Sequence, residues 1–109
     1  MIVSEDTVHK ALQYLADDPH PIALARKDLT DAENRYEQIR AAVYLEQAGT
    51  VDERKSSCEI DGRVGDAKAA VAEAALALDR HRARVRAAEM LIEVWRSENA
   101  NIRAAERVR

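Results

Sequence analysis

The sequence predicts an all-α fold, an elongated antiparallel helical hairpin of the coiled-coil type with a short helix before it. Three observations lead to this prediction. Only five of the 109 residues are glycine or proline, far fewer than a protein of strands and turns needs. Apolar residues recur at alternating steps of three and four along two long stretches of the chain. Charged residues, 34% of the total, fill the positions between them.

A short N-terminal helix is predicted over residues 5–17. Ser4 is a suitable N-cap, and the two acidic residues that follow it suit the positive end of the helix dipole. Val8, Leu12 and Leu15 then recur at helical spacing. The segment DDPHP ends this helix, because residues before proline avoid the helical conformation, and its second proline is suited to open the next helix.

The second predicted helix covers residues 22–48. Gly49 follows it at the place where a glycine commonly ends a helix. The spacing of three and four is typical of a narrow coiled-coil seam rather than a wide apolar face. The seam positions are Ile22, Ala25, Leu29, Ala32, Tyr36, Ile39 and Val43.

A third, short helix is predicted over residues 51–60. Thr50 and Glu53 have the spacing of a capping box, in which each side chain accepts a hydrogen bond from the other residue's backbone. The segment DGRVGD follows this helix, and Gly62 and Gly65 predict a turn there.

The last helix is predicted over residues 64–108, where the heptad pattern continues without interruption. A helix of this length reaches roughly 65 Å, too long for a compact domain of this size. We therefore predict one domain, residues 1–109, in which Ile22–Ile60 runs antiparallel to Val64–Val108 and the first helix caps the open end. The seam positions are Val64, Ala67, Val71, Ala74, Leu78, His81, Val85, Ala88, Ile92, Trp95, Asn99 and Ile102.

Self-association is expected from the composition. Alanine supplies much of the apolar content and buries little area per residue, and phenylalanine is absent. Two helices alone bury only one seam each, so we expect a homodimer or a higher homo-oligomer. Trp95, the only tryptophan, lies on the seam, and we expect it inside the hairpin near Leu29 of the opposite helix.

Charge is distributed unevenly along the chain. The net charge of −3 combines −7 over residues 1–79 with +4 over residues 80–109, where eight arginines accompany four glutamates. A basic end on an acidic protein can attract phosphate, an acidic partner, or the acidic half of a neighbouring subunit. The partner is therefore expected to be another protein, with nucleic acid as the alternative.

The arginines of the segment DRHRARVRAAE are the first candidate contact set. They flank the seam in two pairs on opposite sides. In one interpretation they contact phosphates, because arginine matches phosphate oxygens and binds nucleic acid through them. In the other, which is the usual use of such positions, they pair with acidic residues of the opposite helix such as Glu37, Glu46, Asp52 and Glu53. The four arginines are Arg80, Arg82, Arg84 and Arg86.

A second candidate contact set lies near the end of the last helix, off the seam. It consists of Arg96, Ser97, Asn101 and Arg103. These side chains suit a grip on another protein or on a phosphate, whereas the alternative is a solvated helix end. Polar residues on the seam can set register and oligomer number, and His81, Asn99 and the neighbouring Trp95 are predicted to do so here unless the helices separate.

The residues of catalytic and metal sites do not occur in the required patterns. His9, His20 and His81 lack metal-ligand spacing, and no glycine-rich phosphate loop is present. The acidic pair before His20 could hold a cation, but a helix terminator is the simpler interpretation. We therefore expect no enzyme activity, no cofactor and no metal. The single Cys58, the absence of a signal peptide and the short apolar runs predict a soluble cytoplasmic protein without a membrane span.

Two blocks of sequence resemble a family of small, functionally uncharacterised helical proteins of phages and prophages. The blocks are YLEQAGTVDERKSSCE and AAEMLIEVWRSENAN, and the resemblance covers roughly residues 40–103 with their order and separation kept. Members of this family often carry paired arginines and a glycine after the last asparagine, where this chain has Ile102, Arg103 and Ala104. The family is often encoded near phage recombination and replication genes. The matching residues are Tyr44, Leu45, Glu46, Gly49, Thr50, Val51, Glu53, Arg54, Arg86, Ala87, Ala88, Glu89, Ile92, Trp95, Arg96, Ser97, Asn99, Ala100 and Asn101.

Two functions follow as hypotheses. The first is an interaction protein of a phage that binds a protein in the host cytoplasm, for example an inhibitor or adaptor of a defence complex. The second is an accessory protein of phage recombination or replication that binds nucleic acid through the arginine-rich helix. The acidic net charge and the lack of exposed aromatic residues for base stacking favour the first.

Overall fold

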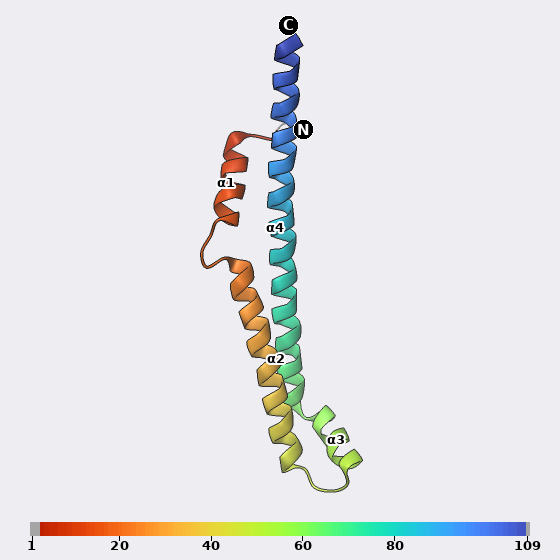
Figure 1. Ribbon diagram of the computed structural model, residues 1–109. Coiled ribbons are helices and arrows are strands. Elements are labelled where there is room, and N and C mark those ends of the chain that lie inside the picture. The colour runs from red at the N-terminus through yellow and green to blue at the C-terminus, as the bar shows by residue number, and fades with distance from the viewer. Residues whose placement is uncertain (1–2, 109) are drawn as a thin grey trace. The chain divides into compact units, whose positions relative to one another are not determined.

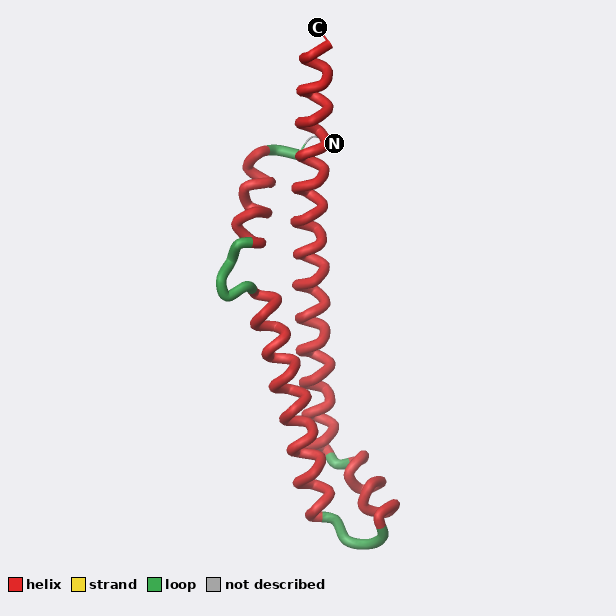
Figure 2. Tube along the Cα trace, viewed as in Figure 1, coloured by secondary structure: helices red, strands yellow, loops and turns green. Residues whose placement is uncertain are grey.

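The structure is a computed structural model that describes residues 3–108 (Figure 1). Within that range the chain forms four helices joined by short loops and no strand, which confirms the predicted all-α fold (Figure 2). The helices are α1, Glu5–Leu15; α2, Pro21–Glu46; α3, Val51–Ile60; and α4, Gly62–Val108. Contacts divide the chain into two compact units that share α4. Unit 1 comprises Met1–Pro21 and Arg80–Arg109, and unit 2 comprises Ile22–Asp79.

In unit 2, α2 runs antiparallel to the first part of α4, which confirms the predicted hairpin for this part only, because Arg80–Arg109 belongs to unit 1. Glu46 at the end of α2 is bonded to Arg63 at the start of α4, whereas Arg35, earlier in α2, lines a groove with Ala70, later in α4. The core of this unit consists of Val43, Cys58 and Val64, which are at most 5% exposed, with Tyr36, Ile39 and Tyr44 packed against them.

The residues predicted for the two seams are the covered residues of the long helices. In α2 every predicted seam residue is buried or half-buried, and in α4 the same holds from Val64 to Asn99. Ile102, the last seam residue, is 54% exposed. Steps of three and four keep side chains on one face of a helix, so the spacing identifies the covered face correctly.

The turn predicted at Gly62 and Gly65 is wrong, because both glycines lie in the first turn of α4. Asp61 is the residue outside the helix. Its carboxylate oxygen Oδ1 accepts a hydrogen bond of 2.8 Å from the backbone N–H of Arg63, as an N-cap does. The aspartate cap starts α4 at Gly62 rather than at Val64.

Arg63 joins the end of α2 to the start of α4. Its guanidinium donates to both carboxylate oxygens of Glu46, at 2.6 and 3.1 Å, and to those of Asp61, at 3.0 and 3.1 Å. These hydrogen bonds favour the charged forms. They hold the pKa of Glu46 and that of Asp61 below their usual values and raise the pKa of Arg63.

The capping box predicted before α3 is confirmed. The Glu53 backbone N–H donates to the Thr50 hydroxyl at 3.2 Å, and the Thr50 backbone N–H donates to the Glu53 carboxylate at 3.3 Å. Helix α2 ends at Glu46, two residues earlier than predicted. Gly49 therefore lies in the loop between α2 and α3 rather than directly after the helix. Its φ of 107° is in the region that favours glycine.

In unit 1, α1 packs lengthwise along the second part of α4 (Figure 1). Ser4 caps α1 as predicted, since its hydroxyl accepts the backbone N–H of Thr7 at 3.1 Å. The helix ends at Leu15 instead of residue 17. Leu12, which was expected on the packed face, is 49% exposed, and Ala11 is buried in its place.

Trp95 packs against α1 within unit 1, which corrects the expectation that it lies near Leu29. The spacing of apolar residues shows which face of α4 is covered, but it does not show which helix covers it. The N-terminal end of α1 is held beside this residue, because the backbone N–H of Val3 donates to Glu98 at 2.8 Å. The buried residues of the cluster are Val3, Val8, Ala11, Ala88 and Ile92, and Trp95 is packed against them with Tyr14, Leu15, Leu91 and Val94.

Candidate interaction surface on α4

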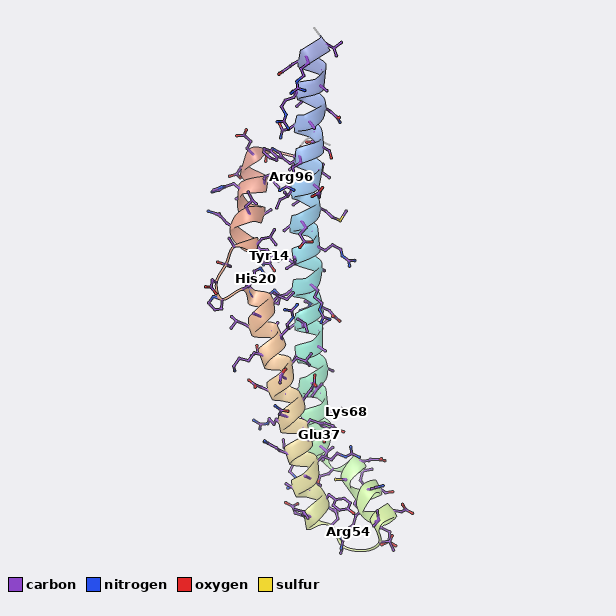
Figure 3. The ribbon with its side chains drawn as sticks, viewed as in Figure 1. Tyr14, His20, Glu37, Arg54, Lys68 and Arg96 are labelled. Carbon is purple, nitrogen blue, oxygen red and sulfur yellow. The ribbon has the colours of Figure 1, made fainter. Side chains whose placement is uncertain are left out.

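The four arginines of the first candidate set are exposed on the part of α4 that belongs to unit 1. Arg84 is held in a defined position, because its guanidinium carbon lies 4.3 Å from the centre of the Tyr14 ring. The Tyr14 ring in turn meets His20 edge to face, with ring centres 4.8 Å apart, at the end of α1 (Figure 3). Sequence reasoning missed Tyr14 and His20, since no local pattern links them to a residue so far along the chain.

Two of the acidic residues that were expected to pair with these arginines have other partners. Glu46 is bonded to Arg63, and Glu53 completes the capping box with Thr50. The predicted pairing is therefore wrong for Glu46 and Glu53. The cause is local, because α3 and the start of α4 bring nearer donors to both carboxylates.

A shallow groove runs along the surface where α1 packs against α4 in unit 1. It has a volume of about 260 Å³, with an apolar floor formed mainly by alanine side chains. Lys10 and Arg84 are its two cationic residues, and Lys10 pairs with Asp6 at 3.2 Å on the exposed side of α1. No carboxylate among residues 3–108 pairs with Arg84. The lining residues are Thr7, Lys10, Ala11, Tyr14, Arg84, Ala87, Ala88 and Leu91.

The second candidate set lies on exposed parts of α4, as predicted. Arg96 pairs with Glu93 one turn earlier at 3.4 Å, and both side chains are about two-thirds exposed or more. Ser97, Asn101 and Arg103 are exposed, and their side chains are not paired with any other residue that the structure describes. Beyond Asn99 the helix is exposed on all sides as far as residue 108.

The polar seam residues have different surroundings. Asn99 is half-buried and donates from Nδ2 to the backbone carbonyl of Trp95 at 3.1 Å, so it bonds within its own helix. His81 is half-buried, and its Nδ1 has no hydrogen-bond partner among the described residues. Both lie on the covered side of α4, while their predicted influence on oligomer number stays a prediction.

The folded units carry less contrasting charges than the two parts of the sequence. Unit 1 contains nine cationic and eight anionic residues, a net of +1, because α1 and its loop bring four acidic residues beside the arginine-rich half of α4. Unit 2 contains eight cationic and twelve anionic residues, a net of −4. The arginines are therefore not the centre of a strongly basic surface, which weakens the phosphate interpretation.

The side chains that could bind a metal ion do not cluster in the part of the chain that the structure describes. Within residues 3–108, no three His, Cys, Asp or Glu side chains lie close enough to share a metal ion. Cys58 is buried, and its thiol donates to the backbone carbonyl of Arg40 at 3.3 Å. None of the described helices is both long enough and apolar enough to cross a bilayer.

Comparison with models of protein families, with curated proteins and with solved structures found no match to this chain.

Proposed function

We propose that this chain is a non-enzymatic interaction protein that binds another protein through α4, in the cytoplasm of a bacterial host. The observation that carries the proposal is the uncovered end of α4. The apolar seam of this helix continues to Ile102, although no other described element of unit 1 covers it there. A helix that presents its seam in this way is suited to pack with a helix or groove of a partner.

The unpaired polar residues of the same segment support this proposal. Asn101 and Arg103 flank Ile102 in the sequence and can supply the polar rim of an interface, where hydrogen bonds set orientation around an apolar centre, and Ser97 is exposed on an earlier turn of the same helix. The resemblance to phage proteins suggests the biological context. In this proposal the chain is a phage protein that acts as an inhibitor or adaptor of a host complex such as a defence complex. Self-association into a homodimer or larger homo-oligomer is part of the same proposal.

Co-purification from host cells with matched variants tests it. Ile102→Glu places a charge on the uncovered seam, whereas Met90→Glu places the same charge on another exposed position of α4, which is 61% exposed. We expect one host protein to be retained by the wild type and by Met90→Glu at a constant ratio, and to be lost with Ile102→Glu. The purified pair should then form a complex on its own, and the mass of the free protein in solution reports its oligomer number.

The alternative function is a nucleic-acid accessory protein of phage recombination or replication. One observation favours it: Arg80 and Arg86 are exposed, and neither is paired with a described residue. Titration into labelled single- and double-stranded DNA at low and physiological salt tests this function. Binding that falls steeply with salt and is lost with Arg80→Ala and Arg86→Ala supports it, and absence of binding at low salt excludes it.

A further inference from the structure

The groove between α1 and α4 in unit 1 has the chemistry of a binding site for a carboxylate. Arg84 is the central residue. A flexible arginine loses side-chain entropy when it is held in one position, and a favourable contact with an aromatic ring offsets this loss. Here the Tyr14 ring holds the guanidinium from one face, at 4.3 Å, and His20 supports the ring from its side.

A guanidinium stacked on an aromatic ring still has its N–H groups in the plane of the fork. These groups match the two oxygens of a carboxylate, and stacking on the ring reduces the entropy lost when the carboxylate binds. Two other arginines hold carboxylates, since Arg63 binds Glu46 and Arg96 binds Glu93, whereas Arg54 lies 5.9 Å from the centre of the Tyr44 ring, a longer contact than that of Arg84 with Tyr14. Arg84 is equally well positioned but has no such partner among the described residues.

The floor of the groove indicates what carries the carboxylate. Ala11, Ala87 and Ala88 have short side chains, which let a third backbone approach closely, and Leu91 extends the apolar surface along α4. Two packed helices with such a groove between them accept a third helix. Asp6 pairs with Lys10 at 3.2 Å, so Arg84 is the cationic lining residue without a carboxylate partner among residues 3–108, which suits one carboxylate better than the successive phosphates of a nucleic-acid backbone.

From these contacts we infer that the groove lined by Tyr14, Arg84 and Leu91 binds an acidic amphipathic helix of a partner protein, with Arg84 pairing with a glutamate or aspartate of that helix. Lys10, which is paired with Asp6, borders the opposite side of the groove. This inference rests on the proposed function and adds to it a second contact region and the chemistry of the partner.

A synthetic peptide tests the inference directly. The probe is a rhodamine-labelled helix of about 15 residues, long enough to be helical, with leucine on one face and glutamate beside it. Binding to the full chain is measured by fluorescence anisotropy at low salt. The intrinsic fluorescence of Trp95 gives a second readout when the peptide carries no label, because Trp95 lies one turn from Leu91 in the same packed cluster.

Three variants with intact helical circular dichroism give the comparison. We expect Arg84→Glu to weaken binding by at least about 10-fold and Arg86→Glu, which makes the same change of charge on another side of α4, to weaken it by less than about 2-fold. Arg84→Lys keeps the charge but loses the fork, so an intermediate loss is expected. A peptide with lysine in place of glutamate should bind Arg84→Glu better than the wild type.

The inference is overturned if the acidic peptide does not bind, or if Arg84→Glu and Arg86→Glu weaken it equally. Displacement of the peptide by an equal concentration of a short DNA strand, with the loss still confined to Arg84, would assign the groove to phosphate instead. The proposed function fails separately: a host protein retained by Arg84→Glu but lost with Ile102→Glu contradicts the groove and leaves the proposed function standing.

Discussion

Substitution of Val43 by alanine measures how much unit 2 depends on its small core. Val43 is 1% exposed and packs with Cys58 and Val64. The substitution removes two buried carbon groups, worth about 0.8 kcal/mol each as transfer free energy, or about 1.6 kcal/mol together. The cavity that remains adds to this, because packed neighbours relax only in part, so we expect a loss of about 2–3 kcal/mol in the free energy of unfolding.

Urea unfolding followed by circular dichroism at the helix band gives the measurement. For a protein of this size a loss of this order moves the midpoint to lower urea by about 1–2 M at an unchanged slope. Leu45→Ala is the matched control, since Leu45 lies two residues further along α2 and is 80% exposed. Its substitution should cost less than about 0.5 kcal/mol. A midpoint shift for Leu45→Ala as large as that for Val43→Ala would refute the assignment of the buried face of α2.

Three further predictions concern the loops, the ion pairs and unit 1. Gly49→Ala should lower the melting temperature, because φ at this residue is 107° and a Cβ would collide with the Glu53 carboxylate. Gly65→Ala should raise the melting temperature, because a Cβ there meets no other atom and alanine favours a helix more than glycine does. Arg63→Met should make the free energy of unfolding depend less on pH at acidic pH. The pKa values of Glu46 and Asp61 are lowered by their bonds to Arg63, so the stability that these bonds contribute is present above the usual carboxyl pKa values near 4 and is lost as the pH falls through the lowered pKa values. If this dependence on pH is unchanged in Arg63→Met, the two ion pairs do not contribute. Val8→Asp should shift the emission of Trp95 to longer wavelength by admitting water to their shared cluster, and an unchanged spectrum would contradict the packing of α1 against α4.

The sequence by itself determined the helices and the covered face of each long helix. Ser4 caps α1, and Thr50 with Glu53 caps α3. Both caps depend on hydrogen bonds between residues three positions apart, so the local sequence is enough to predict them. The heptad spacing likewise identifies the covered face of α4 through Asn99, because helical periodicity does not depend on the partner.

Only the tertiary structure decided which surfaces meet. The heptad spacing puts Trp95 on a covered face but does not show that α1 covers it, since any apolar helix can cover an apolar seam. The helix α4 starts at Gly62 because Asp61 caps it. The two nearby glycines predict a turn instead, so the sequence pattern does not reveal this cap. Arg84 acquires its defined position from Tyr14, seventy positions earlier in the chain, and no local spacing predicts a contact between residues that only the packing of two helices brings together.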